Sequence, residues 1–381
     1  MWHRFRGLPL THAAFVLVAS LLTTAACNSD PGPTDFGSPP VPAPTPYQLV
    51  VPATLFAPAR IPASNPLTNE GVELGRFLFY EKRLSADNTV SCGTCHQQAK
   101  AFTDGRAVSQ GVNGGVGRRS AMSLANVMWV DSLNWDFRFT SIEAQNRFPL
   151  THPNEMGQPL AVSVSKLQNT PDYPLRFERA FGTRTITEDL LLKALGQFQR
   201  TLISGRARFD LARTPSSGVR LTPDEEEGFL LFSTHPSPTV RLRGGNCGDC
   251  HGSGGLFRQQ LMTSANNGLD ALPLDSGIAS VTRRTHDFGK FGVPSLRNAA
   301  LTAPYMHDGR FRTLEDVLDH YNEHVALTSP NLTRDMRASN LDGGRTLLLT
   351  PEEKRKIILF LHTLTDTAFV ADRRFSDPFH P

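Results

Sequence analysis

Four of the five cysteines in this 381-residue chain lie in two copies of one pentapeptide, Cys-Gly-X-Cys-His, at residues 92–96 and 247–251. A C-x-x-C-H run is the attachment signature of a c-type haem. Two thiols one helical turn apart can add to the two vinyl groups of a porphyrin, and the adjacent histidine can then bind the iron. The candidate attachment residues are Cys92, Cys95, His96, Cys247, Cys250 and His251.

Other chemistries also use paired cysteines, and three of them compete with the haem interpretation. The two pairs could join in a structural zinc site, act as redox dithiols or close disulfides in an oxidising compartment. A dithiol or a disulfide does not need the histidine that follows each pair. Because the whole pentapeptide occurs twice, each time after a similar helix, the sequence predicts two covalently bound haem c groups. Multihaem electron carriers have far fewer residues per haem than this chain would have, so the chain length favours an enzyme.

The segments that lead to the two pentapeptides resemble each other, which indicates an internal duplication. Residues 67–96 and 221–251 both start with Leu-Thr, in which Thr68 and Thr222 are suited to cap a helix. Each segment continues through a predicted helix that contains a glycine and ends in Leu-Phe, and reaches the pentapeptide after a loop. The expected fold is mainly α, with two cytochrome c-like haem domains that arose by duplication.

The remaining sequence adds helices and long loops to this plan. Helical spacing of apolar residues predicts helices within 186–204, 313–324 and 350–365, whereas no alternating run is long enough for a substantial sheet. The 28 prolines and 30 glycines predict long connecting loops. The predicted units are an N-terminal haem domain at 60–212, a C-terminal haem domain at 213–366 and a tail at 367–381.

The first 27 residues have the features of a secretory signal peptide. Basic residues precede a short apolar run and small residues, and the run is too short for a comfortable membrane span. It ends at Cys27, the only cysteine outside the pentapeptides, which indicates a lipoprotein signal although Thr24 replaces the usual leucine. Plain cleavage after Ala26 is the alternative. With residues 28–59 as a Pro-rich linker, we expect a periplasmic protein tethered to a membrane by a lipid on Cys27.

The charge balance gives no sign of a nucleic-acid partner. The formal net charge is +3, and the sequence has no run of lysine and arginine with interleaved aromatic residues. We therefore expect no binding to nucleic acid.

Residues 133–160 contain the side chains that peroxide chemistry at a haem would need. Cleavage of an O–O bond requires an open iron position, an acid–base group and a polar group that steers the proton. Glu155 and Gln145 are candidates for the last two roles, and Trp135 is a large indole in the same aromatic-rich stretch. Composition alone would equally make Gln145 and Glu155 ordinary solvated residues.

Specific motifs give these residues a context. They are LGRFLFYEKRLSADNTVSCGTCH, AFTDGRAVSQG, NWDFR, PNEMG, FGVPSLRNAALTAPYMHDGRFRTLEDVLDHY and ILFLHTLT. Over nearly all of residues 60–365 the chain resembles the bacterial di-haem cytochrome c peroxidase family, which includes MauG. The resemblance implies that Gln145 and Glu155 are distal catalytic residues at a peroxide-reactive N-terminal haem. It also implies that Trp135 lies between the two haems and helps electrons pass.

The resemblance further implies a calcium ion between the two domains. Its expected ligands are the backbone carbonyls of Thr302 and Pro304 and the side chain of Ser120, which stands where the family often has asparagine. Calcium is therefore an expected cofactor beside the two haems.

The first iron is expected to have an open position. Many family members close the N-terminal haem with a removable histidine soon after the first pentapeptide, but residues 97–151 contain no histidine. We therefore expect the iron on His96 to be five-coordinate or water-bound, with His152 as the alternative sixth ligand.

The second iron is expected to be closed by Tyr321. Ordinary cytochrome c peroxidases place a methionine at the matching position, whereas the MauG/MbnH-like branch of the family has tyrosine there. A phenolate is a hard anionic ligand that stabilises ferric and more oxidised iron and lowers the reduction potential. Met306, His320 and His324 are the alternative ligands.

Together these features predict a periplasmic di-haem oxidoreductase that uses hydrogen peroxide to reach a high-valent, bis-ferryl-like state and then oxidises a side chain of a protein partner. By resemblance, that partner is a copper-binding or a quinone-cofactor protein. One alternative is a cytochrome c peroxidase that reduces hydrogen peroxide to water with electrons from a small cytochrome or cupredoxin. Another is a non-catalytic electron carrier or peroxide sensor.

Overall fold

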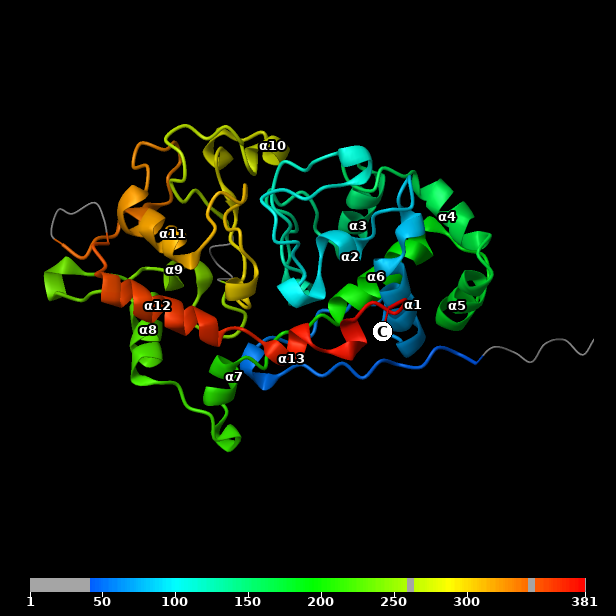
Figure 1. Ribbon diagram of the computed structural model, residues 1–381, viewed down its shortest axis with the longest axis horizontal. Helices are drawn as coiled ribbons and strands as arrows, with labels where there is room; N and C mark the ends of the chain where they lie inside the picture. The colour runs from blue at the N-terminus through cyan, green and yellow to red at the C-terminus, as the bar shows by residue number, and fades with distance from the viewer. Residues whose placement is uncertain (1–41, 259–263, 342–346, 381) are drawn as a thin grey trace, which may run out of the picture. The chain divides into compact units, whose positions relative to one another are not determined.

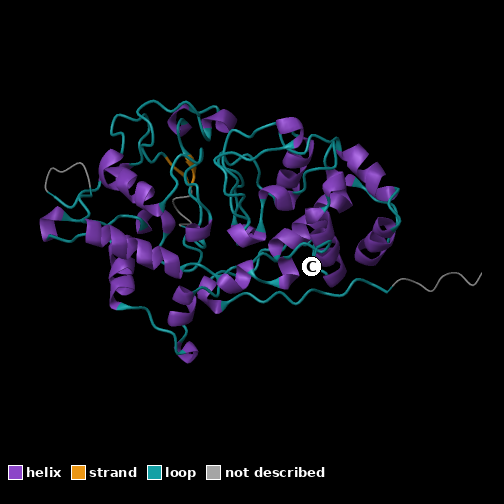
Figure 2. Ribbon diagram, viewed as in Figure 1, coloured by secondary structure: helices purple, strands orange, loops and turns teal. Residues whose placement is uncertain are grey.

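The computed structural model describes residues 42–258, 264–341 and 347–380. The predicted signal peptide with Cys27 and the first part of the predicted linker lie outside the described residues. Helices and loops make up nearly all of the described residues (Figure 2), and the predicted mainly α fold class is confirmed. The strands of the described residues are β1 (Ser264–Ala265) and β2 (Phe291–Gly292), which pair antiparallel. No helix in the described ranges is long and apolar enough to cross a membrane.

The first half is organised around two crossing helices, α1 (Asn69–Tyr80) and α6 (Glu188–Arg200), which lie side by side in Figure 1. The predicted cap at Thr68 is present, because its hydroxyl accepts a hydrogen bond from the Gly71 amide at 3.0 Å. The helices meet at Gly75, where a Cβ atom would lie 2.0 Å from the backbone oxygen of Ala194. Only glycine permits so close an approach.

The second half repeats this arrangement with α8 (Pro223–Ser233) and α12 (Pro351–Thr363). Both helices begin with a capping box, at Thr222 and Thr350. They cross at Gly228, where a Cβ atom would lie 2.0 Å from the backbone oxygen of Lys356. We propose on these two matching crossings that the halves arose by duplication, and the boundaries 60–212 and 213–366 stay a prediction.

The other helices are shorter or lie on the outside of these two pairs. In the first half they are α2 (Cys92–Cys95), α3 (Ile142–Thr151), α4 (Leu160–Gln168), α5 (Asp172–Phe181) and α7 (Arg208–Ala212). In the second they are α9 (Gly248–His251), α10 (Ala279–Thr282) and α11 (Leu314–Asp319) with a π-helical turn at His320–His324, while α13 (Thr367–Val370) lies in the tail.

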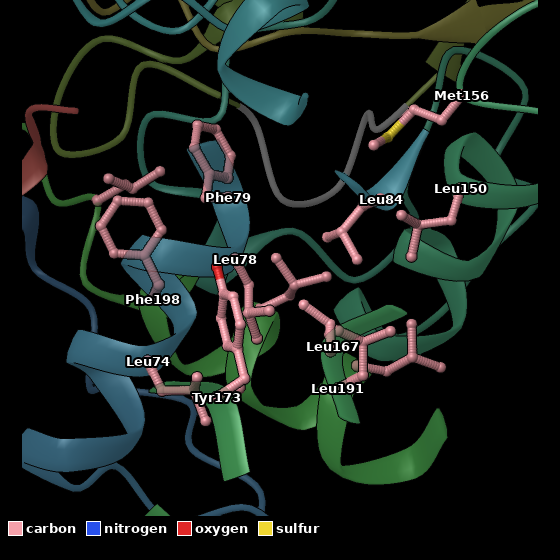
Figure 3. Close-up of a cluster of buried hydrophobic side chains, with 14 of the residues drawn as sticks. Leu74, Leu78, Phe79, Leu84, Leu150, Met156, Leu167, Tyr173, Leu191 and Phe198 are labelled. Atoms are coloured by element: carbon pink, nitrogen blue, oxygen red, sulfur yellow. The ribbon is translucent and has the colours of Figure 1, made fainter. Parts of the chain in front are cut away.

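Each helix pair has its own apolar core. Figure 3 shows the first core, in which Leu74, Leu78 and Phe79 of α1 lie near Phe198 of α6. The second core is dominated by phenylalanines, and the ring centroids of Phe232 and Phe360 are 5.1 Å apart. Aromatic pairs at this separation add to the free energy gained from burial.

The two ends of the described chain both pack on the first half. In the tail, Phe369 and Phe375 join the first core, and the Tyr80 hydroxyl donates to the backbone oxygen of Phe375 at 2.7 Å. In the part of the predicted linker that the structure describes, the Asn69 amide donates to the Thr45 carbonyl and Leu55 is buried. This part of the linker segment is therefore anchored to the folded chain.

A buried ion pair joins α7 of the first half to the second half. The guanidinium of Arg297 donates to both carboxylate oxygens of Asp210 at 2.7 Å. Their side chains are 0% and 3% exposed, so neither charge has water as an alternative partner. Arg297 also donates to the carbonyl of Gly255. Bidentate geometry of this kind gives the strongest arginine–carboxylate contacts.

We predict that Asp210→Asn lowers the free energy of unfolding by about 3–5 kcal/mol, because it leaves the buried Arg297 charge without a partner. Urea unfolding of the holoprotein, followed by far-ultraviolet circular dichroism, measures this. The control is Glu227→Gln, which removes a surface partner of Lys356 and should leave the unfolding midpoint nearly unchanged. Equal midpoints for the two variants would contradict the importance of the buried pair.

Candidate functional site

The first pentapeptide forms the single turn α2, which places both thiols on one side of the helix. Its histidine, His96, follows directly and has its Nδ1 2.8 Å from the backbone oxygen of Phe102. Ala101 and Phe102 both have positive φ angles, which turns the chain back toward the histidine. With Nδ1–H donated to a carbonyl, Nε2 is the nitrogen left to bind a metal. Burial lowers the pKa of His96, which favours the neutral imidazole that binds metals.

The second pentapeptide repeats this geometry. Its histidine, His251, ends α9, and its Nδ1 lies 3.0 Å from the backbone oxygen of Pro294. Burial lowers the pKa of His251 to about 4. Each pentapeptide thus presents two thiols and one neutral, oriented imidazole.

A cavity of about 960 Å³ lies against the first pentapeptide. Its wall includes Cys92, Cys95 and His96 together with the predicted distal residues Gln145 and Glu155. The volume is at the upper end of the usual range for cofactor sites. The structure thus brings the predicted attachment residues and the predicted distal residues into one site.

An unsatisfied polar group supports the fit of a polar cofactor in this cavity. The Nδ2 of Asn146 is buried and has no hydrogen-bond partner among the described residues. Its own amide oxygen accepts a hydrogen bond from Gln199 Nε2 at 2.8 Å, so the free N–H group is oriented. Both residues line the cavity. Since buried donors are normally paired, the wall is suited to a group with oxygen acceptors, such as a haem.

Glu155 is fixed by its backbone beside the first cavity. Its amide donates to the His152 carbonyl, and its carbonyl accepts from the Val112 amide at 2.8 Å. Gly111 makes this contact possible, because a Cβ atom there would lie 2.4 Å from the Glu155 oxygen. Although 35% of the side chain is exposed, burial by the surrounding protein raises the pKa of the Glu155 carboxyl to about 7. His152, the alternative iron ligand, also lines the cavity.

A second cavity of about 200 Å³ lies against the second pentapeptide. Its wall includes Cys247, Cys250, His251, Tyr321 and Met306, among mostly apolar neighbours. These residue types fit a haem with two thioether bonds and a histidine ligand. This cavity is smaller than the one at the first pentapeptide.

Tyr321 lies in the π-helical turn that follows α11. Such turns are often found at functional sites. Hydrogen bonds hold the residues on either side of Tyr321 in place. His320 Nε2 lies 3.1 Å from the Asn267 carbonyl, and the Leu349 amide donates to the Asn322 side chain. Burial raises the pKa of Tyr321 to about 12, while a hydrogen bond from Asn267 acts in the opposite direction.

Tyr321 and Met306, the two candidate sixth ligands that line this cavity, both contact the side-chain amide of Asn267. Asn267 Nδ2 is 3.3 Å from the Tyr321 hydroxyl oxygen and 3.4 Å from the Met306 sulfur. The other two candidates, His320 and His324, do not belong to the described wall of the cavity. No motif in the sequence pointed to Asn267, which lies 39 residues from Met306 and 54 residues from Tyr321 along the chain.

Trp135 belongs to the walls of both cavities. Its indole Nε1 donates to the Ser120 carbonyl at 3.0 Å, and its own carbonyl accepts from the Gly292 amide at 2.8 Å. The next residue, Asp136, forms an ion pair with Arg119, which also binds Asp275 in the second half. Both halves of the chain therefore hold the tryptophan in place.

The predicted calcium ligands lie near this tryptophan but are not shown to bind an ion. Thr302 and Pro304 line the first cavity, and the Ser120 hydroxyl donates to the Met306 carbonyl at 2.9 Å. Within the described ranges no group of three or more histidine, cysteine, aspartate or glutamate side chains could hold a metal ion. The predicted calcium site is built mainly from backbone carbonyls instead, and it stays a prediction.

Comparison with known proteins places the chain in a family. A family model described as di-haem cytochrome c peroxidase matches residues 69–215. The methylamine utilization protein MauG of Methylophilus methylotrophus is 34% identical over 280 residues, which cover 74% of this chain and 80% of that protein. Cytochrome c551 peroxidase of Nitrosomonas europaea is 29% identical over 308 residues, with 80% and 83% covered.

A solved structure of a MauG-like protein associated with microbial copper homeostasis is 34% identical, with a TM-score of 0.76, and covers 87% of this chain and 99% of its own. These findings confirm the predicted resemblance and the predicted class of oxidoreductase, and a di-haem family implies two haem cofactors. The chain belongs to the di-haem cytochrome c peroxidase family that includes MauG.

Proposed function

We propose that this protein is a periplasmic enzyme that uses hydrogen peroxide to oxidise a protein partner. The observation that carries the proposal is the difference between the two cavities, since Glu155 lines the first and Tyr321 lines the second. Overall, one hydrogen peroxide, two protons and two electrons give two water molecules. The two electrons come from a side chain of the partner, which is oxidised.

In this proposal each pentapeptide attaches one haem through its two cysteines and binds the iron through its histidine, His96 or His251. Haem bound in the first cavity supplies the iron at which the O–O bond is cleaved. Trp135 lines both cavities, and its large indole is the side chain proposed to carry electrons between them.

Glu155 is the proposed acid–base group, and Gln145 orients the bound peroxide. The carboxylate takes a proton from one peroxide oxygen and gives it to the other, which then leaves as water. A pKa of about 7 suits this task, because the carboxyl then exchanges protons readily in either direction near neutral pH. The presence of this pair in the wall argues against a purely electron-carrying protein or a sensor.

Tyr321 favours oxidation of a protein partner over rapid reduction of peroxide. An anionic oxygen ligand holds an iron at low potential and stabilises its oxidised states. Such a site receives electrons poorly from donors of high potential. The similarity to MauG and to a MauG-like protein associated with copper homeostasis supports the same choice, with a quinone-cofactor or copper-binding protein as partner.

A second candidate function is supported by the similarity to cytochrome c551 peroxidase. In that case a small cytochrome or cupredoxin supplies the electrons. The two candidates separate when peroxide is added to the diferric protein, once with a copper-binding partner and once with a reduced small cytochrome. A change in the mass of the partner supports the first, and rapid steady-state oxidation of the cytochrome supports the second.

We also propose that the protein is exported, that a lipid on Cys27 tethers it to a membrane, and that a calcium ion bound by Thr302, Pro304 and Ser120 stabilises the region between the haems. The support for these three proposals is the sequence pattern and the resemblance described above.

The attachment of haem can be tested by counting. We predict that the double variant Cys92→Ala/Cys95→Ala keeps one covalent haem and that Cys247→Ala/Cys250→Ala keeps the other. The mass of the denatured protein and the pyridine haemochrome assay give the number per chain. Two covalent haems in either double variant would contradict the assignment.

The role of Glu155 can be tested by its rate and its pH dependence. We predict that Glu155→Gln slows the reaction with peroxide by roughly 100-fold, because the glutamine cannot exchange a proton. In the unsubstituted protein the base form is scarce below the raised pKa, so the rate should rise as the pH increases through about 7. Stopped-flow spectroscopy with excess peroxide measures both effects. A normal rate in the variant, or the same pH profile in both proteins, would remove Glu155 from the mechanism.

The ligand of the second iron can be tested with Tyr321→Phe. We predict a changed ferric spectrum for the second haem, because phenylalanine has no oxygen to bind the iron. Tyr305→Phe is the matched control, since Tyr305 lines the same cavity while its hydroxyl bonds to the Ala299 carbonyl. An unchanged spectrum in Tyr321→Phe would reject this ligand, and loss of the signal in Met306→Leu would assign it to the sulfur.

A further inference from the structure

Five arginine side chains of the described residues line the first cavity, and they differ in how their charges are compensated. They are Arg118, Arg119, Arg138, Arg258 and Arg297. Arg119 and Arg138 pair with Asp136, and Arg297 pairs with Asp210. Arg118 is exposed to solvent. Arg258 is the partly buried member of this set whose charge is not compensated by an ion pair with a described residue.

No carboxylate of the described residues forms an ion pair with Arg258. The charged groups that act on it are Asp131 and Arg60, and these two pair with each other. The guanidinium Nε donates to the Val293 carbonyl at 3.1 Å, which fixes its orientation without neutralising its charge. Burial lowers the pKa of Arg258, so the site makes the cation less favourable than it is in water. A cation removed from water is normally compensated by an anion.

The position of Arg258 indicates which kind of anion could compensate its charge. Arg258 follows the second pentapeptide along the chain, yet its side chain lines the first cavity and not the second. The same cavity contains Asn146, whose buried Nδ2 has no partner among the described residues. A cation without a carboxylate ion-pair partner and a buried amide donor without a hydrogen-bond partner thus line the same cavity as His96.

We propose that Arg258 is the counter-ion of a propionate carboxylate of the haem held at His96. This inference rests on the proposed attachment of a haem to the first pentapeptide. A planar guanidinium binds a carboxylate through two parallel hydrogen bonds, which a lysine cannot reproduce. The second half of the chain thereby supplies a charge to the haem of the first half. Compensation of the propionate charge makes the ferric state less favourable and raises the reduction potential of that haem.

The test compares Arg258→Gln and Arg258→Lys with a control, Arg206→Gln, whose side chain is exposed and lies outside both cavity walls. Spectroelectrochemical titration of the holoprotein gives the reduction potential of each haem. We expect Arg258→Gln to shift the redox equilibrium of the first haem about tenfold toward ferric iron, which is 59 mV for one electron. The second haem and the control should not change. Resonance Raman spectra should show altered propionate bending modes in Arg258→Gln.

Arg258→Lys keeps the charge and loses the paired hydrogen bonds. Arg258→Lys should alter the propionate bending modes but change the reduction potential of the first haem only slightly. If Arg258→Gln takes up no haem, the Raman spectrum of Arg258→Lys alone tests the proposal. Unchanged propionate modes in the lysine variant, or an unchanged potential of the first haem in the glutamine variant, would overturn the inference. A wild-type protein without haem at Cys92 and Cys95 would instead overturn the proposed function, so the two failures are distinguishable.

Discussion

The hydrogen bond from the Trp135 indole to the Ser120 carbonyl fixes the one tryptophan that lines both cavities. Ser120 in turn donates its hydroxyl to the Met306 carbonyl, so the same short segment contacts the wall of the second cavity. The ion pair between Asp136 and Arg119 adds a second restraint. It leaves the other oxygen of Asp136 buried without a hydrogen-bond partner among the described residues, which costs free energy. This unpaired oxygen lies next to the tryptophan that lines both cavities.

The two pentapeptides are chemically alike, and the surroundings make the two sites different. Each histidine is oriented by one backbone carbonyl and is kept neutral by burial. The first cavity adds Glu155, whose pKa is raised close to neutrality by burial. The second adds Tyr321 and Met306, which share the amide of Asn267. In the proposed function, these differences in a few wall residues would make the first site the reactive one and the second the storage site.

The sequence alone predicted those parts of the structure that depend on local pattern. The pentapeptides, the threonine caps of α1 and α8 and the mainly helical class follow from short-range rules. The placement of Gln145, Glu155 and Trp135 in cavity walls agrees with the resemblance, although their roles are still predictions. Asn267 and Arg258 could not be found this way. Asn267 meets Tyr321 across 54 residues of sequence, and Arg258 lines the cavity of the other half, so only tertiary contacts identify them.

The central claim is that one iron is open and the other is closed by a side chain of the protein. Electron paramagnetic resonance of the diferric holoprotein, recorded before and after one equivalent of cyanide, tests it most directly. We expect one high-spin and one low-spin ferric signal at the start, and cyanide should convert only the high-spin signal. Two low-spin signals before cyanide, or binding of cyanide to both irons with equal affinity, would contradict the account.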